Sequence, residues 1–93
     1  MALRLTIRGV VQGVGFRWFA RQEANALGIS GWVKNRADGA VEILAGGDAA
    51  ALERFRARVS QGPPGARVES VEAAEDVRDD VSGPLPKPFT VLR

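Results

Sequence analysis

A short glycine-rich segment near the N-terminus holds the residues best suited to chemistry. Residues 12–17 read Gln12-Gly13-Val14-Gly15-Phe16-Arg17, between a stretch with strand-like alternation and one with helical spacing. Glycine allows positive φ and close approach to a ligand, and the first N–H groups of a helix are unpaired and attract anions. Arg17 adds a planar guanidinium that can donate to two phosphate oxygens at once. The segment therefore predicts a site for a dianionic phosphoryl group.

The same segment also fits a plainer description, a tight turn followed by a surface arginine. Short glycine motifs often occur without any ligand. The segment is not a P-loop, because no Gly-Lys-Ser/Thr follows it. It is not a dinucleotide fingerprint either, because Trp18 stands where the third glycine belongs. Composition and spacing favour an anion site and leave its ligand open.

Asn35 is a second candidate, at the end of a strand predicted over residues 29–35. Its amide offers a donor and an acceptor and does not titrate near neutrality, so it can orient a water molecule without acting as a base. Asparagine before a hairpin more commonly bonds the local backbone. From the residues alone, that ordinary role is favoured.

The remaining aromatic and basic residues near these candidates are interpreted mainly as structural residues and not as parts of the site. Trp18 and Trp32 are interpreted as packing residues, although Trp18 can also shield the phosphate site. Charges beside a site usually form a solvated face. Arg21, Lys34 and Arg36 are therefore assigned at most an assisting role in substrate capture.

The composition excludes several kinds of chemistry. The 93 residues contain no histidine, cysteine or tyrosine, which excludes histidine general bases, Ser-His triads, disulfides and histidine or thiolate metal sites. The net charge of +2 favours small anions but is far from the dense basic surface of a nucleic-acid binder. We therefore expect no metal, no cofactor and no nucleic-acid partner.

The hydrophobic pattern predicts the elements that must position these residues. One helix follows Gly15 with apolar residues at helical spacing up to Leu27, and Gly28 follows as its C-cap. A second helix follows the N-cap Asp48, carries an apolar stripe of Leu52, Phe55 and Val59, and ends at the Gly-Pro-Pro-Gly segment 62–65. In the first strand, Leu3, Leu5 and Ile7 alternate on one face, which predicts that this face is buried. Strands are predicted over residues 3–8, 29–35, 40–45 and 66–75, with an irregularity between Val68 and Val71, a loop over 76–88 and a short final strand over 89–92.

The order of these elements is strand, helix, strand, strand, helix, strand, with the brief extra strand last. Two right-handed βαβ-type halves joined by a hairpin give an antiparallel sheet with two helices on one face. This is the ferredoxin-like α/β sandwich, of the α+β class. The length predicts a single domain over residues 1–93. Arg4 and Arg8 interrupt the N-terminus, which fits neither a signal peptide nor a membrane span, so a cytoplasmic protein is expected. Because the domain is small and isolated, a monomer is expected.

Two stretches of the chain together resemble the acylphosphatase family. The first is Gly9-Val10-Val11-Gln12-Gly13-Val14-Gly15-Phe16-Arg17. The second is Gly31-Trp32-Val33-Lys34-Asn35, followed by Gly39, Val41 and Gly47. The two motifs span residues 9–47, and two motifs at the expected distance are far more specific than either alone.

The resemblance implies a small, metal-free hydrolase that splits acyl phosphates into a carboxylate and inorganic phosphate. It places the phosphate loop at residues 12–17, the catalytic arginine at Arg17 and the water-positioning asparagine at Asn35. The chain departs from the family pattern in its acidic, proline-bearing segment 76–88 and in ending on Arg93 where many members end on an aromatic residue. These departures concern stability or leaving-group preference, because neither falls on the implied site.

Two alternatives remain open from the sequence. The first is a non-catalytic module of the same fold that binds phosphate or carbamoyl phosphate, since similar domains occur fused to larger maturation enzymes. The end of this chain after one domain favours a free-standing enzyme. The second is RNA binding, because the RNA-recognition motif shares this order of elements. That motif stacks bases on aromatic residues of its central strands, and residues 40–45 contain none. The physiological acyl phosphate is left open.

Overall fold

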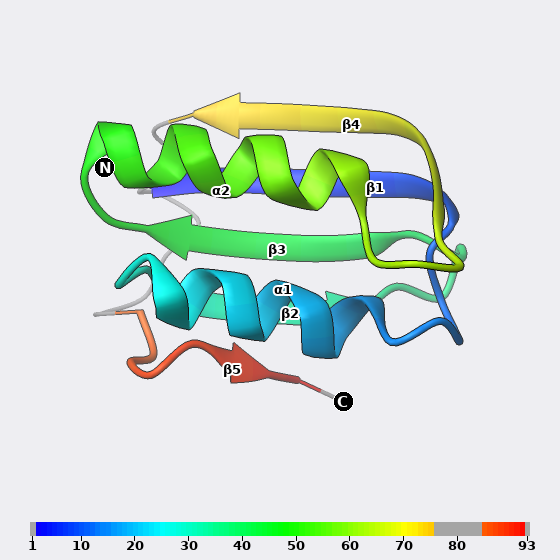
Figure 1. Ribbon diagram of the computed structural model, residues 1–93, viewed down its shortest axis with the longest axis horizontal. Helices are drawn as coiled ribbons and strands as arrows, with labels where there is room; N and C mark the ends of the chain where they lie inside the picture. Colours follow the sequence, from blue (N-terminus) through cyan, green and yellow to red (C-terminus); the bar gives the residue numbers. More distant parts are fainter. Residues whose placement is uncertain (1, 76–84, 93) are drawn as a thin grey trace.

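Two helices cover one face of a five-stranded sheet in the computed structural model, which describes residues 2–75 and 85–92 (Figure 1). The sheet order is β4-β1-β3-β2-β5. The element bounds are β1 (Ala2–Val10), α1 (Phe16–Ala26), β2 (Ser30–Asn35), β3 (Val41–Gly46), α2 (Ala49–Gln61), β4 (Arg67–Glu75) and β5 (Thr90–Val91). The predicted ferredoxin-like α+β sandwich is confirmed. Of the predicted loop 76–88, residues 76–84 lie outside the described part.

The last strand departs from the predicted, wholly antiparallel sheet. The pairs β1–β3, β1–β4 and β2–β3 are antiparallel, but β5 pairs with β2 in parallel, with Trp32 opposite Thr90 and Val33 opposite Val91. The strand directions explain this difference. β4 runs antiparallel to β2, so the C-terminal end of β4 and the N-terminal end of β2 lie at the same end of the strands. A strand that starts at this end and pairs with β2 therefore runs in the same direction as β2.

The core lies between the sheet and the helices, where the periodicity predicted it. Leu3, Leu5 and Ile7 alternate into it from β1, as residues two apart in a strand must. The helices contribute the stripes Phe16, Ala20 and Ala24 from α1 and Leu52, Phe55 and Val59 from α2, all at most 3% exposed. Asp48 caps α2, because its carboxylate accepts a hydrogen bond of 2.8 Å from the N–H of Ala51.

A β-bulge in β4 lies opposite the end of β1, just before the glycine-rich loop. Arg8 pairs with Ser70 and Gly9 with Val68, so the register of β4 shifts by one residue. Gly9 has φ 135°, and a Cβ atom there would lie 2.0 Å from the main-chain oxygen of Arg67. Only glycine fits this close approach. The irregularity predicted between Val68 and Val71 is confirmed.

Candidate active site

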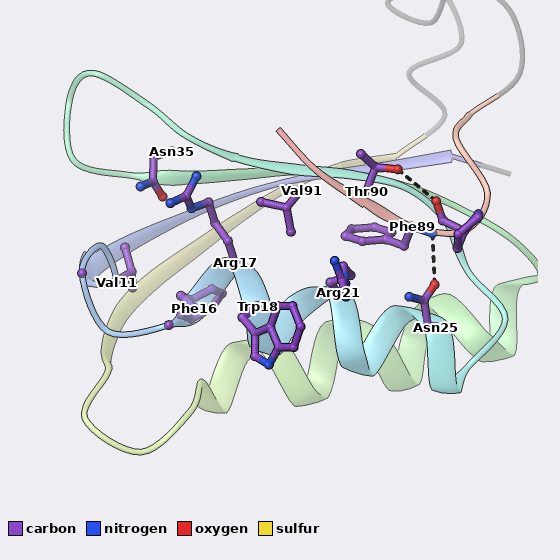
Figure 2. A pocket seen from close by; sticks show the side chains of 13 residues that line it. Val11, Phe16, Arg17, Trp18, Arg21, Asn25, Asn35, Phe89, Thr90 and Val91 are labelled. Carbon is purple, nitrogen blue, oxygen red and sulfur yellow. Dashed lines mark hydrogen bonds between the residues drawn. The ribbon is translucent and has the colours of Figure 1, made fainter. Parts of the chain in front are cut away.

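A groove with a volume of about 660 Å³ runs along α1 beside β5. Arg17 and Asn35 line one end of the groove (Figure 2), and Gly13 and Gly15 are also among its lining residues. Asn25 lies towards the other end, with Phe89 and Thr90 beside it. The groove lining thus includes five of the site residues predicted from the sequence, Gly13, Gly15, Phe16, Arg17 and Asn35, but not Gln12 or Val14. The groove also extends well beyond these residues.

The glycine-rich loop presents free main-chain donors at this end. Gly13 and Gly15 adopt φ values of 78° and 77°, which L-residues with side chains rarely take. Gly15 is the N-cap of α1, and no side chain caps this helix. Within the described part of the chain, no hydrogen bond engages the main-chain N–H groups of residues 12–17. These donors and the positive end of the α1 dipole favour an anion at this point.

Three side chains of the loop serve structure rather than a ligand. Gln12 Nε2 donates to the main-chain oxygens of Arg36 at 2.8 Å and Ala40 at 2.9 Å. Val14 packs against the hydrophobic core, and Phe16 is part of that core, with its side chain 1% exposed. The main chain of these residues is what they can offer to a ligand.

Arg17 extends from the first turn of α1 and is half-buried. One of its terminal nitrogens, Nη1, donates to the main-chain oxygen of Leu92 at 3.2 Å. A guanidinium carries five N–H donors, so this contact orients the side chain while most of its donors stay available. No sequence feature indicates this contact, because any residue at position 92 supplies the same carbonyl group.

Asn35 is the last residue of β2, opposite Val41 of β3, and its side chain is exposed. Among the described residues, no hydrogen bond engages its side-chain amide. The local backbone bond that commonly explains an asparagine before a hairpin is thus not found there. Figure 2 shows Asn35 and Arg17 at the same end of the groove. Its donor and acceptor are both available to a molecule bound there.

The other residues weighed from the sequence separate into two groups. Lys34 and Arg36 lie outside the groove lining and pair with Glu42 at 3.7 Å and with Asp38 at 3.3 Å. Trp18 and Arg21 do line the groove. The interpretation of Trp18 as a packing residue is wrong: it is 54% exposed, because its position on α1 faces away from the core.

Trp32 lies on the surface of the sheet. Its neighbours Gly31 and Val33 are buried while Trp32 is half-buried, so its ring lies on the face of the sheet opposite the helices. Lys34 Nζ lies 5.2 Å from the centroid of this ring, a cation–π contact on the same face. Neither residue lines the groove.

Asp38 fixes the turn between β2 and β3, next to Asn35. Its carboxylate accepts a hydrogen bond of 3.1 Å from the N–H of Ala40 and one of 3.2 Å from Arg8 Nη1. The Ala40 bond, followed by the Arg8 bond, lowers the pKa of Asp38 from its ordinary value. The hairpin that carries Asn35 is therefore held by an ionised carboxylate.

Within the described ranges, no group of three or more acidic side chains is placed to hold a metal ion. Neither α1 nor α2 has the length and apolar character needed to cross a membrane.

The acylphosphatase family model matches residues 3–83. A Thermotoga maritima protein named acylphosphatase is 50% identical over 74 residues, which cover 80% of this chain and 82% of that protein. A protein of the same name from an Azoarcus species is 49% identical over 79 residues, covering 85% and 81%. The crystal structure of acylphosphatase from Bacillus subtilis superposes with a TM-score of 0.82 at 39% identity, covering 99% of this chain and 98% of that one. The chain belongs to the acylphosphatase family.

Proposed function

We propose that this acylphosphatase hydrolyses small acyl phosphates by direct attack of water on a phosphoryl group held by Arg17 and the loop 12–17. One observation carries the proposal. The unpaired N–H groups of the loop, the Arg17 guanidinium and the Asn35 amide all lie at one end of one groove. A dianionic phosphoryl group matches these donors in charge and in number of acceptor oxygens.

The substrate itself lowers the demand on the protein. An acyl phosphate is an activated mixed anhydride, and its leaving group is a stable carboxylate. The water oxygen forms a bond to phosphorus while the bond between phosphorus and the acyl oxygen breaks, and the electron pair leaves with the carboxylate. Charge on the phosphoryl oxygens is stabilised by Arg17 and the loop N–H groups, which are already oriented before the reaction. No covalent enzyme intermediate is required.

Asn35 orients the attacking water in this proposal. Its Oδ1 atom accepts a hydrogen bond from the water and its Nδ2 atom can donate one, so the amide fixes the direction of approach. The amide does not take up the proton that the attacking water releases. The proton passes to a phosphoryl oxygen of the substrate, so that the products are a carboxylate and inorganic phosphate.

The test compares turnover with binding. Hydrolysis of benzoyl phosphate is measured in the presence of EDTA, and binding of inorganic phosphate is measured by calorimetry. The proposal expects turnover that EDTA does not reduce, together with competitive inhibition by phosphate. Phosphate binding without turnover would instead identify the alternative, a non-catalytic module of the same fold that senses phosphate or carbamoyl phosphate.

The proposal includes a single-domain, monomeric, cytoplasmic enzyme without a nucleic-acid partner. The sequence contains no cysteine, so the fold does not depend on disulfides and needs no oxidising compartment. The absence of aromatic residues from β3, the central strand, argues against base stacking. Light scattering after size exclusion tests the monomer. A gel shift with single-stranded RNA at low and high salt tests the lack of RNA binding.

A further inference from the structure

The groove is too long for a phosphoryl group alone. Its volume of about 660 Å³ falls in the range of roughly 300–1,000 Å³ that is usual for sites of larger ligands. Beyond Arg17 it continues along α1 past Arg21 to Asn25. These three residues are spaced four apart, so they share one face of the helix, and Figure 2 shows them along the groove.

Arg21 is the second cation among the described residues of the groove, and none of the described carboxylates pairs with it. Its guanidinium carbon lies 4.3 Å from the ring centroid of Trp18, a stacking contact that restrains the planar group. In the described residues, no hydrogen bond or ion pair engages this guanidinium. Some of the other described arginines do have carboxylate partners: Arg8 and Arg36 pair with Asp38, and Arg58 pairs with Glu23.

Negative charge is absent from the described lining of the groove. None of the described residues that line it is acidic, and the charged ones among them are Arg17 and Arg21. Asn25 faces the far end, but its Oδ1 atom accepts a hydrogen bond of 3.0 Å from the N–H of Phe89, which fixes the segment leading into β5 beside α1. The groove is therefore a positively charged channel with two arginines one helical turn apart.

We propose that Arg21, stacked on Trp18, forms a second subsite that binds an oxyanion on the acyl part of the substrate. This inference rests on the proposed function, because it takes the phosphoryl position from Arg17. Four residues of helix rise separate the Cα atoms of Arg17 and Arg21 by roughly 6 Å along the axis. A substrate that engages both arginines therefore carries its second anion across a short acyl chain or one aromatic ring from the phosphoryl group.

The test uses one pair of substrates that differ in that anion, benzoyl phosphate and 4-carboxybenzoyl phosphate. The measured quantity is the ratio of kcat/KM for the carboxylated substrate to kcat/KM for the plain one. We expect Arg21→Gln to lower this ratio by about tenfold, which corresponds to ~1.4 kcal/mol. Arg21→Lys keeps the charge without the planar fork and should restore part of the preference.

Arg54→Gln is the matched control. Arg54 is exposed on α2 and does not line the groove, and its loss changes the net charge by the same amount as Arg21→Gln. An equal fall of the ratio in both variants would show long-range attraction instead of a subsite. An unchanged ratio in Arg21→Gln would also overturn the proposal.

A binding measurement separates this inference from the proposed function. Benzoylphosphonate and 4-carboxybenzoylphosphonate cannot be hydrolysed at the phosphorus–carbon bond, so their dissociation constants report binding without turnover. We expect the carboxylated analogue to lose affinity in Arg21→Gln by about the same factor. Failure of wild type to turn over benzoyl phosphate would refute the proposed function alone. Equal loss of affinity for both analogues in Arg21→Gln would refute the subsite alone.

Discussion

The side-chain amide of Gln12 donates a hydrogen bond of 2.8 Å to the main-chain oxygen of Arg36. The same nitrogen also donates to the main-chain oxygen of Ala40 at 2.9 Å. Both oxygens belong to the turn that joins β2 to β3, where the N–H of Arg36 donates to Ala40 at 2.8 Å. Since Arg36 directly follows Asn35, one side chain ties the glycine-rich loop to the strand end that carries Asn35.

We expect Gln12→Leu to lower kcat by about tenfold while changing the dissociation constant of phosphate little, because Asn35 loses its fixed position relative to the loop. The loss of these hydrogen bonds should also lower the free energy of unfolding by about 1 kcal/mol. Steady-state kinetics, calorimetry and urea denaturation measure the three quantities. Gln22→Leu, at an exposed position of α1, is the control. Weaker phosphate binding with unchanged kcat would mean that Gln12 shapes only the loop.

Arg17→Ala should abolish phosphate binding and activity together. Removal of the guanidinium takes away the fork that donates to the phosphoryl oxygens, and the loss in kcat/KM should be at least ~10²-fold. Arg17→Lys should recover only part of the activity, since an ammonium lacks the planar geometry. Heat denaturation with and without phosphate is the direct check of binding. Equal protection by phosphate in Arg17→Ala and wild type would refute this role of Arg17.

Asn35→Ala should lower kcat by about 10²-fold and leave phosphate affinity nearly intact, because in the proposed mechanism the amide contacts the water and not the phosphoryl group. Its side chain is exposed, so the melting temperature should stay close to that of wild type. Single-turnover kinetics with benzoyl phosphate, alongside calorimetry with phosphate, separate the two effects. If affinity collapsed while turnover per bound substrate persisted, Asn35 would be a binding residue.

Asp38 should make stability depend on pH in the acid range. The hydrogen bond from Ala40, followed by that from Arg8, lowers the pKa of Asp38 below its ordinary value of 3.8. A carboxyl group whose pKa is lowered by folding stabilises the fold. This stabilisation is fully present when the pH is above the ordinary pKa, and it is lost as the pH falls through the folded-state pKa.

Asp38→Asn keeps an oxygen for the Ala40 bond and removes the charge. Its melting temperature should lie below that of wild type at neutral pH, and the two should converge in strong acid. Thermal melts across that range measure the difference. A constant gap between the two proteins at every pH would show that the ionisation of Asp38 does not stabilise the hairpin.

The sequence by itself determined the elements and much of the core. The alternation of Leu3, Leu5 and Ile7 and the helical spacing of Leu52, Phe55 and Val59 predicted which faces are buried, because one buried face imposes the period of its own element. Asp48 predicted the start of α2 because its capping bond is local. The motifs around Arg17 and Asn35 predicted the family for the same reason, since each motif is a contiguous stretch of side chains.

Only the tertiary structure decided how these local pieces meet. The contact of Arg17 with the carbonyl of Leu92 and that of Gln12 with the carbonyl of Arg36 join residues 75 and 24 positions apart. Every residue carries a main-chain oxygen, so the sequence does not indicate which one a side chain contacts. The partner depends on strand order and register alone. The parallel pairing of β5 with β2 is set in the same way. It brings β5 beside α1, and the groove past Arg17 to Arg21 and Asn25 exists only because these distant segments lie together.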